Sequence, residues 1–513
     1  MMRLATVLAL LLAGCAPTPA KPPPPAPARP TDFESAGREA ADLLRELIRI
    51  DTINPPQKGS TKKNANETAL CLRVQEILAA DGIDADVIES AEGRGNLVAR
   101  IKGSDPSKKG LLMMAHVDVV NVDPDKWTHP PLEAVEKDGY IWGRGALDDK
   151  GPAAVSIEAM RIIARRKTPL SRDLVLMLNA DEESSGRYGA EFMVEKHRAK
   201  VDPAFVINEG GRVMMRGGAV ETVSIQSAEK IYNDIKIWIR GESGHSSVPR
   251  ANNAIYSMAR VLARLESHRA PIRINATVAA AYAGQWEREK DAAAAALMRA
   301  VAAGDVKAGE ELARRDPKAN AALRSTFVPT VVEGGIRENV LPPDVLVNVN
   351  IRLLPGEKLD DMIETLARVA ELPPFATVEV KAGDDWRAAL RAWIVGQEEK
   401  RRRGAEGVFD AAIVIADRGM DAPASPLENE LYRAIEKVAR EMSPEAVVTP
   451  SMSTGATDSR FWRARGVPAY GLLPLPATDE DLKGFHDHNE RVAVSSVGYG
   501  VRMMVRIIEE VCR

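Results

Sequence analysis

The sequence predicts an α/β fold in which a mostly parallel sheet domain is interrupted by an inserted, ferredoxin-like α+β domain. Residues 110–116, 173–180 and 204–208 are near-continuous apolar runs, which are typical of parallel strands covered on both faces. The segment 150–166 between the first two runs is an amphipathic helix, so strands and helices alternate. From about residue 228 the order becomes strand, helix, strand, strand, helix, strand, which indicates a separate α+β layer.

The first 30 residues are predicted to lie outside the fold, as a lipoprotein signal and a Pro-rich tether. One Arg and a short apolar run precede Leu12 to Cys15, which resembles a bacterial lipobox and predicts lipidation of Cys15. The alternative is ordinary signal cleavage next to an incidental cysteine. Residues 16–30 are rich in proline and cannot form a packed core. We therefore expect an exported, membrane-anchored lipoprotein on the periplasmic face of the cell envelope.

The predicted domains follow the change of pattern along the chain. Their order is the first part of the main domain (31–225), the inserted domain (226–383), an unassigned connector (384–417) and the second part of the main domain (418–513). A helical periodicity at 41–50 lies in the first part. The inserted domain is expected to have hinges near Ser227 and Gly383 and an Ala-rich helical insert at about 280–325.

Composition and charge restrict the partners of the chain. With 45% apolar and 28% charged residues, the 513-residue chain has the composition of a soluble globular protein. Its formal net charge of -4 gives no electrostatic basis for nucleic-acid binding, and no later segment is apolar over the length of a bilayer span. Cys71 and Cys512 are the candidate pair for one disulfide in an exported chain.

Acidic residues and histidines follow the predicted strands of the main domain. Asp181, Glu182 and Glu183 crowd three like charges after an apolar run, which is costly unless a cation lies among them. Similar groups recur at His116 with Asp118, at Asp148 with Asp149, at Glu209, and at His486 with His488. Each motif alone is also compatible with a solvated loop or a structural histidine. Together they lie at the sheet edge where ligands bind, and imidazole with carboxylate suits zinc and related divalent ions.

The ordered set of motifs resembles the zinc exopeptidase superfamily of aminoacylase, carboxypeptidase S, glutamate carboxypeptidase and succinyl-diaminopimelate desuccinylase. The resemblance covers nearly all of the chain from Phe33 onward. The helical insert and the motif GRGALDDKGP are most similar to the carboxypeptidase S-like branch. The resemblance implies a di-zinc catalytic domain and an inserted lid and dimerisation domain. The implied cofactors are two Zn²⁺ ions, which Co²⁺ or Mn²⁺ can replace.

The resemblance also implies a role for each residue of the cluster. The implied ligands are His116 and Glu209 on one zinc, Glu183 and His486 on the other, and Asp148 bridging both. Glu182 is implied as the general base for the attacking water, and Asp118 as the group that orients His116. The peptide bond between Asp148 and Asp149 is implied to be cis.

The inserted domain contributes the implied substrate contacts. The motif GESGHSSVPR resembles the lid motif of the family and implies that His245 stabilises an oxyanion in trans, across a homodimer formed by the lid domains. The other implied substrate contacts are Asn339, Arg352 and Gly455, and the guanidinium of Arg352 is suited to pair with a substrate carboxylate. The alternatives are that His245 caps a helix, that Arg352 is a surface residue, and that the helical insert leaves a monomer.

Two residues depart from the family pattern or compete with it. Asn208 stands where relatives often have Asp, and His488 is a second candidate ligand beside His486.

We expect an exported hydrolase that cleaves the amide bond before a C-terminal amino acid, in a small peptide or an N-acyl amino acid. The reverse condensation is also chemically possible. The alternatives are a non-catalytic, surface-anchored binding protein that kept the fold, and a single-domain zinc aminopeptidase without the inserted domain.

Overall fold

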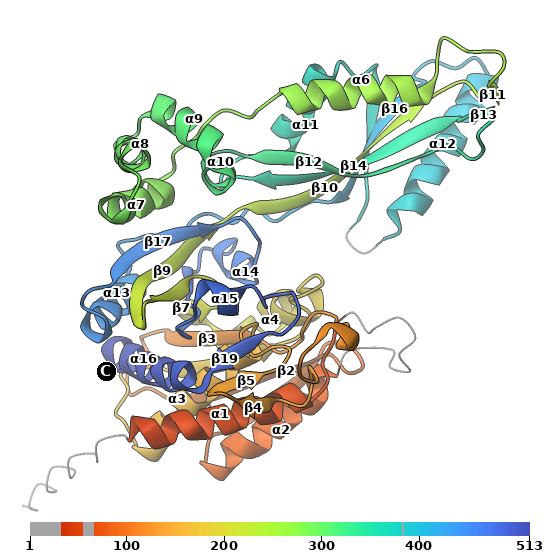
Figure 1. Cartoon of the computed structure of the whole chain (residues 1–513). Coiled ribbons are helices and arrows are strands. Elements are labelled where there is room, and N and C mark those ends of the chain that lie inside the picture. Colours follow the sequence, from red (N-terminus) through yellow and green to blue (C-terminus); the bar gives the residue numbers. More distant parts are fainter. Residues whose placement is uncertain (1–31, 55–65, 382–383) are drawn as a thin grey trace, which may run out of the picture.

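The computed structural model describes residues 32–54, 66–381 and 384–513, which form a main domain and a second domain beside it (Figure 1). The predicted signal, Cys15, the Pro-rich tether and the hinge at Gly383 lie outside the described residues. In the described ranges, no helix combines the length and the apolar character that a membrane span requires.

A nine-stranded sheet forms the main domain, and its central strands β6, β3, β7 and β18 run parallel. The strands are, across the sheet, β1 (Ala85–Glu89), β2 (Gly95–Ile101), β6 (Leu174–Asn179), β3 (Gly110–His116), β7 (Pro203–Asn208), β18 (Ala469–Gly471), β9 (Ala219–Glu229) and β17 (Val447–Ser453), with β8 (Arg212–Arg216) paired to β9. In β3, Leu111 and Met113 belong to one buried cluster, whereas Leu112 and Met114 belong to another. Both faces are buried, so the strand is continuously apolar. The predicted α/β fold is confirmed.

Helices cover both faces of this sheet. One face carries α1 (Phe33–Arg49), α2 (Glu67–Ala80), α3 (Lys150–Arg165), α13 (Glu430–Met442) and α16 (Val494–Cys512). The other face carries η2 (Arg187–Glu191), α4 (Phe192–Lys196), α5 (Arg198–Val201) and α14 (Ser459–Arg463). A three-stranded sheet of β4 (Val135–Lys137), β5 (Tyr140–Trp142) and β19 (Arg491–Ala493) completes the domain, with η1 (Pro124–Lys126) and α15 (Asp479–Leu482).

The candidate disulfide between Cys71 and Cys512 does not form, because both cysteines are free and buried. The thiol of Cys71 donates to the carbonyl of Gly95, at the start of β2. The carbonyl of Cys512 accepts from Ser171, just before β6. Since β2 and β6 are antiparallel, these two strand starts lie at opposite ends of the pair. The sequence contains no signal for this separation.

A five-stranded sheet forms the inserted domain, which we define as residues 231–417. Its strands, in order, are β12 (Thr326–Gly334), β14 (Asp344–Leu353), β10 (Ile231–Arg240), β16 (Ala411–Asp417) and β15 (Phe375–Glu379). The helices α6 (Ala254–Ser267) and α11 (Leu359–Ala370) pack on one face. The short pair β11 (Gly244–His245) and β13 (Val340–Leu341) lies at the tip, away from the main domain (Figure 1).

The segment 384–417, which the sequence leaves unassigned, adds helix α12 (Trp386–Arg402) and strand β16 to the inserted domain. Strand β16 lies between β10 and β15, antiparallel to the first and parallel to the second. Parallel neighbours require a crossover, and α12 supplies it on the second face of the sheet. There the ring of Trp393 contacts the ring of Trp238 edge to face. The inserted domain therefore extends beyond residue 383.

The helical insert, here residues 276–323, connects the two domains. It consists of α7 (Ala276–Gln285), η3 (Trp286–Arg288), α8 (Ala292–Ala302), α9 (Val306–Arg315) and α10 (Pro317–Leu323). Although it leaves the inserted domain between α6 and β12, its helix α7 lies against β17, the edge strand of the large sheet (Figure 1). The hydroxyl of Thr449 donates to the carbonyl of Ala281, and the hydroxyls of Ser227 and Thr277 are 3.0 Å apart.

Candidate metal centre

Two histidines face the two oxygens of one buried carboxylate. His116 ends β3, and its Nε2 lies 3.0 Å from Oδ1 of Asp148. His486 lies on a loop after α15, and its Nε2 is 2.8 Å from Oδ2 of Asp148. A glutamate accompanies each histidine: Glu209 Oε2 is 3.9 Å from Nε2 of His116, and Glu183 Oε2 is 3.2 Å from Nε2 of His486. This is the arrangement of a carboxylate that bridges two cations, each with one histidine and one glutamate.

Glu182 lies in the same cluster. Ligand atoms of His116, Glu182 and Glu209 are within 4.8 Å of one another, as are those of His116, Asp148 and Glu183. Glu182 and Glu183 follow β6, and Glu209 follows β7. Because β3, β6 and β7 are parallel neighbours, their carboxyl ends meet at one sheet edge.

The electrostatics of the cluster fit a cationic group. Burial and repulsion by neighbouring carboxylates raise the pKa of Glu182 to about 7, and raise the pKa of Glu209 well above its ordinary value. Hydrogen bonds to Asp148 and Glu183 raise the pKa of His486 to about 10. In the described part of the chain, Oε1 of Glu183 is buried without a hydrogen-bond partner. Two divalent cations would neutralise these acids and satisfy the free oxygen.

Asp118 contacts His116 and also holds the backbone of Glu182 and Glu183. Nδ1 of His116 lies 3.0 Å from the carbonyl of Asp118 and 3.4 Å from its carboxylate. That carboxylate accepts from the backbone N–H groups of Glu182 and Glu183 and from Nδ2 of Asn54 at 2.8 Å. Although burial disfavours the charged form, hydrogen bonds from His116 and Asn54 hold the pKa of Asp118 below its ordinary value. Asn54, far away in sequence and in no motif, is a positioning residue that the sequence does not reveal.

The loop that presents Asp148 is fixed by Glu490, which sequence reasoning also missed. The carboxylate of Glu490 accepts from the backbone N–H groups of Gly145, Leu147 and Asp148 and from the guanidinium of Arg144. The Asp148–Asp149 peptide bond is cis, as predicted. Glu490 stands four residues after His486, so one segment supplies both a histidine of the cluster and the support of Asp148.

Asp181, the third acid of the run at residues 181–183, is not among the residues whose ligand atoms lie together around His116. Its carboxylate accepts from the hydroxyl of Ser185 at 2.6 Å and from Nδ2 of Asn54 at 3.2 Å, and Arg94 lies 3.7 Å away. Arg94 compensates the charge of Asp181, and Asn54 connects Asp181 to Asp118. His488 likewise contacts Asp487 rather than the cluster.

Arg352 and Gly455 lie in a cleft that opens onto the candidate metal-binding residues around Asp148, which we call the metal cluster. The cleft has a volume of about 670 Å³, and its wall includes Glu182, Glu183, His486, Arg352 and Gly455. The guanidinium of Arg352 stacks 4.5 Å from the ring centre of Tyr232 and donates to Asn350. Burial lowers the pKa of Arg352, since it disfavours the charged form. Further cations in this cleft, not singled out from the sequence, are Arg187, Lys230, Arg418 and Arg460.

His245 and Asn339 lie together but away from the metal cluster. His245 is exposed in β11, and its Nδ1 is 2.7 Å from the hydroxyl of Ser247. The carbonyl of Asn339 accepts from the N–H of Ser246. Both are at the tip of the inserted domain that Figure 1 shows remote from the large sheet. The structure therefore brings together five predicted ligands, Glu182 and Asp118, and separates His245 and Asn339 from them.

The motifs, the parallel sheet and the paired acids together point to one known family. Residues 112–510 match the model of peptidase family M20/M25/M40. The chain belongs to this family. Members of the M20 family are metal-dependent amidohydrolases, so the chain is a metal-dependent hydrolase, and the carboxylate and histidine cluster is compatible with a dinuclear metal site.

Named relatives and solved structures agree with the M20 assignment. The chain is 26% identical over 489 residues to the human N-fatty-acyl-amino acid synthase/hydrolase PM20D1, covering 94% of this chain and 89% of that protein. It is 25% identical to the probable carboxypeptidase S-like 2 of Dictyostelium discoideum, covering 78% and 71%. The fold is similar to the M20 family metallo-carboxypeptidase Sso-CP2 of Sulfolobus solfataricus, with 17% identity, a TM-score of 0.62 and coverage of 92% and 99%. The predicted superfamily is thus confirmed.

Proposed function

We propose that this M20 protein is an exported di-zinc hydrolase that cleaves the amide bond before a C-terminal amino acid, in N-acyl amino acids and small peptides. The observation that carries the proposal is the shared carboxylate of Asp148, which faces His116 with one oxygen and His486 with the other. The name of the human relative, an N-fatty-acyl-amino acid synthase/hydrolase, supports the N-acyl class.

In the proposed hydrolysis, each of several residues of this chain has a separate role. Zinc ions at the cluster, when bound, polarise the scissile carbonyl and acidify a water molecule. Glu182 accepts the proton of the attacking water on its carboxylate and donates it to the nitrogen of the leaving amino acid. Asp118 keeps His116 and the backbone of Glu182 in place through its hydrogen bonds. Arg352 pairs with the carboxylate of the leaving amino acid, since it lies in the cleft that adjoins Glu182.

A dimer and a membrane anchor are part of the proposal. β12 is an edge strand of the inserted domain, and its Val328, Val331 and Val332 are 54%, 48% and 58% exposed. An exposed apolar edge strand favours pairing with a second copy. The helical insert packs on β17 instead, which leaves this edge uncovered by it. A dimer would let His245 reach the partner's metal cluster, and lipidation of Cys15 would hold the enzyme at the cell envelope.

A substrate screen tests the proposed reaction. Zinc-loaded protein is incubated with N-acyl amino acids and dipeptides, and release of the amino acid is measured. We expect hydrolysis in at least one class, and a loss of about 10²–10⁴-fold in Glu182→Gln with unchanged metal content. The exposed Glu195→Gln on α4 is the matched control and should keep its activity. No hydrolysis of either class by the metal-loaded protein would refute the proposal.

A further inference from the structure

We propose that the cleft between the metal cluster and the helical insert binds the acyl half of the substrate and takes an extended, apolar acyl group. This inference rests on the proposed function, because it assigns a subsite to the same amide-cleaving centre. It concerns the insert, a part of the chain to which the reaction itself assigns no task.

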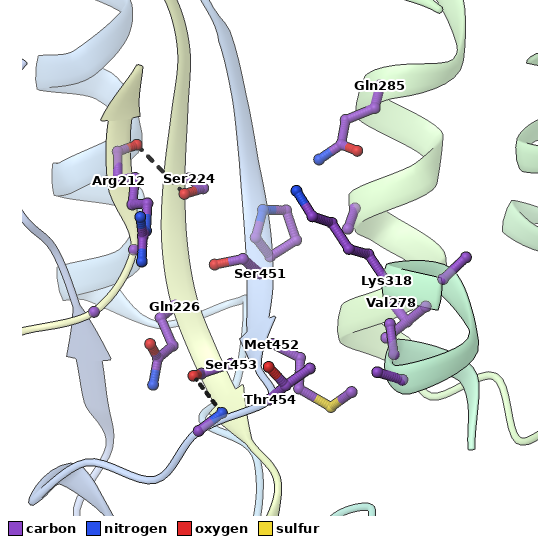
Figure 2. A pocket seen from close by; sticks show the side chains of 18 of the residues that line it. Arg212, Ser224, Gln226, Val278, Gln285, Lys318, Ser451, Met452, Ser453 and Thr454 are labelled. Atoms are coloured by element: carbon purple, nitrogen blue, oxygen red, sulfur yellow. Dashed lines mark hydrogen bonds between the residues drawn. The ribbon is translucent and has the colours of Figure 1, made fainter. Parts of the chain in front are cut away.

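One continuous cleft joins the cluster to the insert. Its volume is about 1200 Å³, and Glu182, Glu209 and His486 line one end. The other end is lined by residues of α7, α8, α9 and α10. Figure 2 shows Val278, Gln285 and Lys318 on the side of the insert and Arg212, Ser224 and Gln226 on the side of the large sheet, with residues of β17 between them. Typical small-ligand pockets have about 300–1,000 Å³, so this cleft holds more than one amino-acid side chain.

The insert side of the cleft is lined by small and apolar side chains. Five alanines line this side, and their short side chains leave the cleft wide: Ala281, Ala294, Ala319, Ala321 and Ala322. Val278 and Met298 add apolar surface from the core of the insert, and Met452 of β17 packs against that core. The insert also contributes five exposed charged residues to the cleft, namely Glu289, Asp291, Arg315, Asp316 and Lys318. An apolar chain therefore has an apolar wall on the side of the insert, whereas the side of the large sheet offers polar groups such as Ser224, Gln226 and Ser451.

The two clefts at the cluster differ in charge. This difference indicates which cleft binds the amino-acid half of the substrate and which binds the acyl half. Apart from the acids of the cluster and the adjoining Asp149, the smaller cleft is lined by five cations and three acids, whereas the larger cleft is lined by three of each. The smaller cleft, which contains Arg352, therefore suits the carboxylate of the amino acid. The scissile bond lies over the metal cluster, where both clefts meet at Glu182 and His486. The acyl group on the other side of that bond must then extend into the cleft of the insert.

Contacts with the large sheet fix the position of this wall. Asn275 donates to Sδ of Met452 at 3.4 Å, and Thr449 donates to the carbonyl of Ala281 at 3.3 Å. Ser227 and Thr277 add a further hydrogen bond at the start of α7. Because β17 also leads into Gly455 beside the cluster, wall and cluster share one rigid element. A preformed wall limits acyl length and does not merely close around any substrate.

The test compares two tryptophans placed on the same helix. Ala281 of α7 lines the cleft and is half-buried, whereas Ala283 is exposed and does not line it. Ala281→Trp should fill the cleft, and Ala283→Trp is the matched control. Ala281→Leu is the milder variant should the tryptophan impair folding, which melting curves and metal content reveal. Substrates are N-acetyl, N-octanoyl and N-hexadecanoyl derivatives of one amino acid.

In the unsubstituted protein kcat/KM should rise with chain length, by up to about fourfold for each buried methylene. In Ala281→Trp the ratio of kcat/KM for the longest to the shortest substrate should fall by about 30-fold or more, because several methylenes lose their site. Ala283→Trp should keep the ratio. A ratio unchanged by both Ala281 variants, or no length dependence in the unsubstituted protein, would overturn the inference.

Binding without turnover separates this subsite from the reaction. A fluorescent polyene fatty acid is displaced from the protein by octanoate and hexadecanoate. We expect hexadecanoate to bind more tightly than octanoate and to lose about tenfold or more in affinity in Ala281→Trp. Such binding without hydrolysis of any N-acyl amino acid would refute the proposed reaction and leave the subsite supported. Equal binding by the Ala281 and Ala283 variants would overturn the subsite.

Discussion

The carboxylate of Asp118 connects the two sides of the metal cluster at the scale of single residues. It accepts from the N–H groups of Glu182 and Glu183, while its own carbonyl faces His116. Asn54 donates to this carboxylate and also to Asp181, so one amide holds two acids in place. Groups that orient metal ligands in this way contribute strongly to metal affinity.

Asn54→Ala should therefore weaken metal binding although Asn54 is not an expected ligand. Without the side-chain amide of Asn54, the carboxylate of Asp118 loses a hydrogen-bond donor. The strand ends that carry His116 and Glu183 then lose a fixed support. We expect a drop of about 10–100-fold in metal affinity, measured by competition with a chelator. Asn66→Ala is the control, because Asn66 makes no side-chain capping bond to α2. An affinity within twofold of the native value would contradict this role of Asn54.

At the scale of elements, the loop between β5 and α3 depends on the segment before β19. Glu490, at the end of that segment, is buried and accepts from three backbone N–H groups of the loop and from Arg144, itself 2% exposed. Asp148 is thus positioned by a residue more than 300 positions later in the chain.

Glu490→Ala should destabilise the protein by about 3–5 kcal/mol, since it leaves the guanidinium of Arg144 buried without its partner. Denaturant unfolding measures this change. The double variant Arg144→Met with Glu490→Leu is the control, because it removes both charges and should recover a large part of the loss. A loss below about 1 kcal/mol in the single variant would show that this ion pair does not hold the loop.

Sequence patterns predict the residues whose position follows from strand ends. His116, Glu183 and Glu209 follow apolar runs, and the parallel arrangement of those runs places their ends together. Asn54 and Glu490 escape such reasoning, because single polar residues outside an apolar run have no periodicity to reveal their partners.

The inserted domain shows a similar limit. Apolar and polar residues alternate recognisably in the sequences of β10 and β14 because one face of the sheet is less buried, as the burial pattern of β14 shows. Strand β16 is a short apolar run between two neighbours, and α12 carries a long charged end, so neither has a decisive pattern. Pairing across the sheet, which the sequence does not encode locally, decides their place.

At the scale of the whole molecule, the main domain carries the metal cluster and the inserted domain carries His245 at its tip. Figure 1 shows this tip far from the carboxyl edge of the large sheet in the same chain. If His245 stabilises the oxyanion, a second copy must supply it or the inserted domain must move. The contacts of the helical insert with β17 oppose a large movement within one chain.

Mixing two inactive variants distinguishes these routes. His245→Ala and Glu182→Gln are combined under conditions of subunit exchange. Random hybrids contain one complete site, with an intact cluster from one chain and His245 from the other, so about a quarter of native activity should return. No recovery, with exchange proven by mass spectrometry, would mean that His245 does not act in trans.

Metal content and amide hydrolysis, measured on the same samples, test the central claim that the cluster around Asp148 binds two ions required for catalysis. Chelation should abolish hydrolysis of the preferred substrate, and titration with zinc should restore it as occupancy approaches about two ions per chain. Asp148→Asn should lower both occupancy and turnover, because the amide offers one neutral oxygen in place of a shared anion. Full activity in metal-free protein, or an Asp148→Asn variant with two ions and native turnover, would contradict the account.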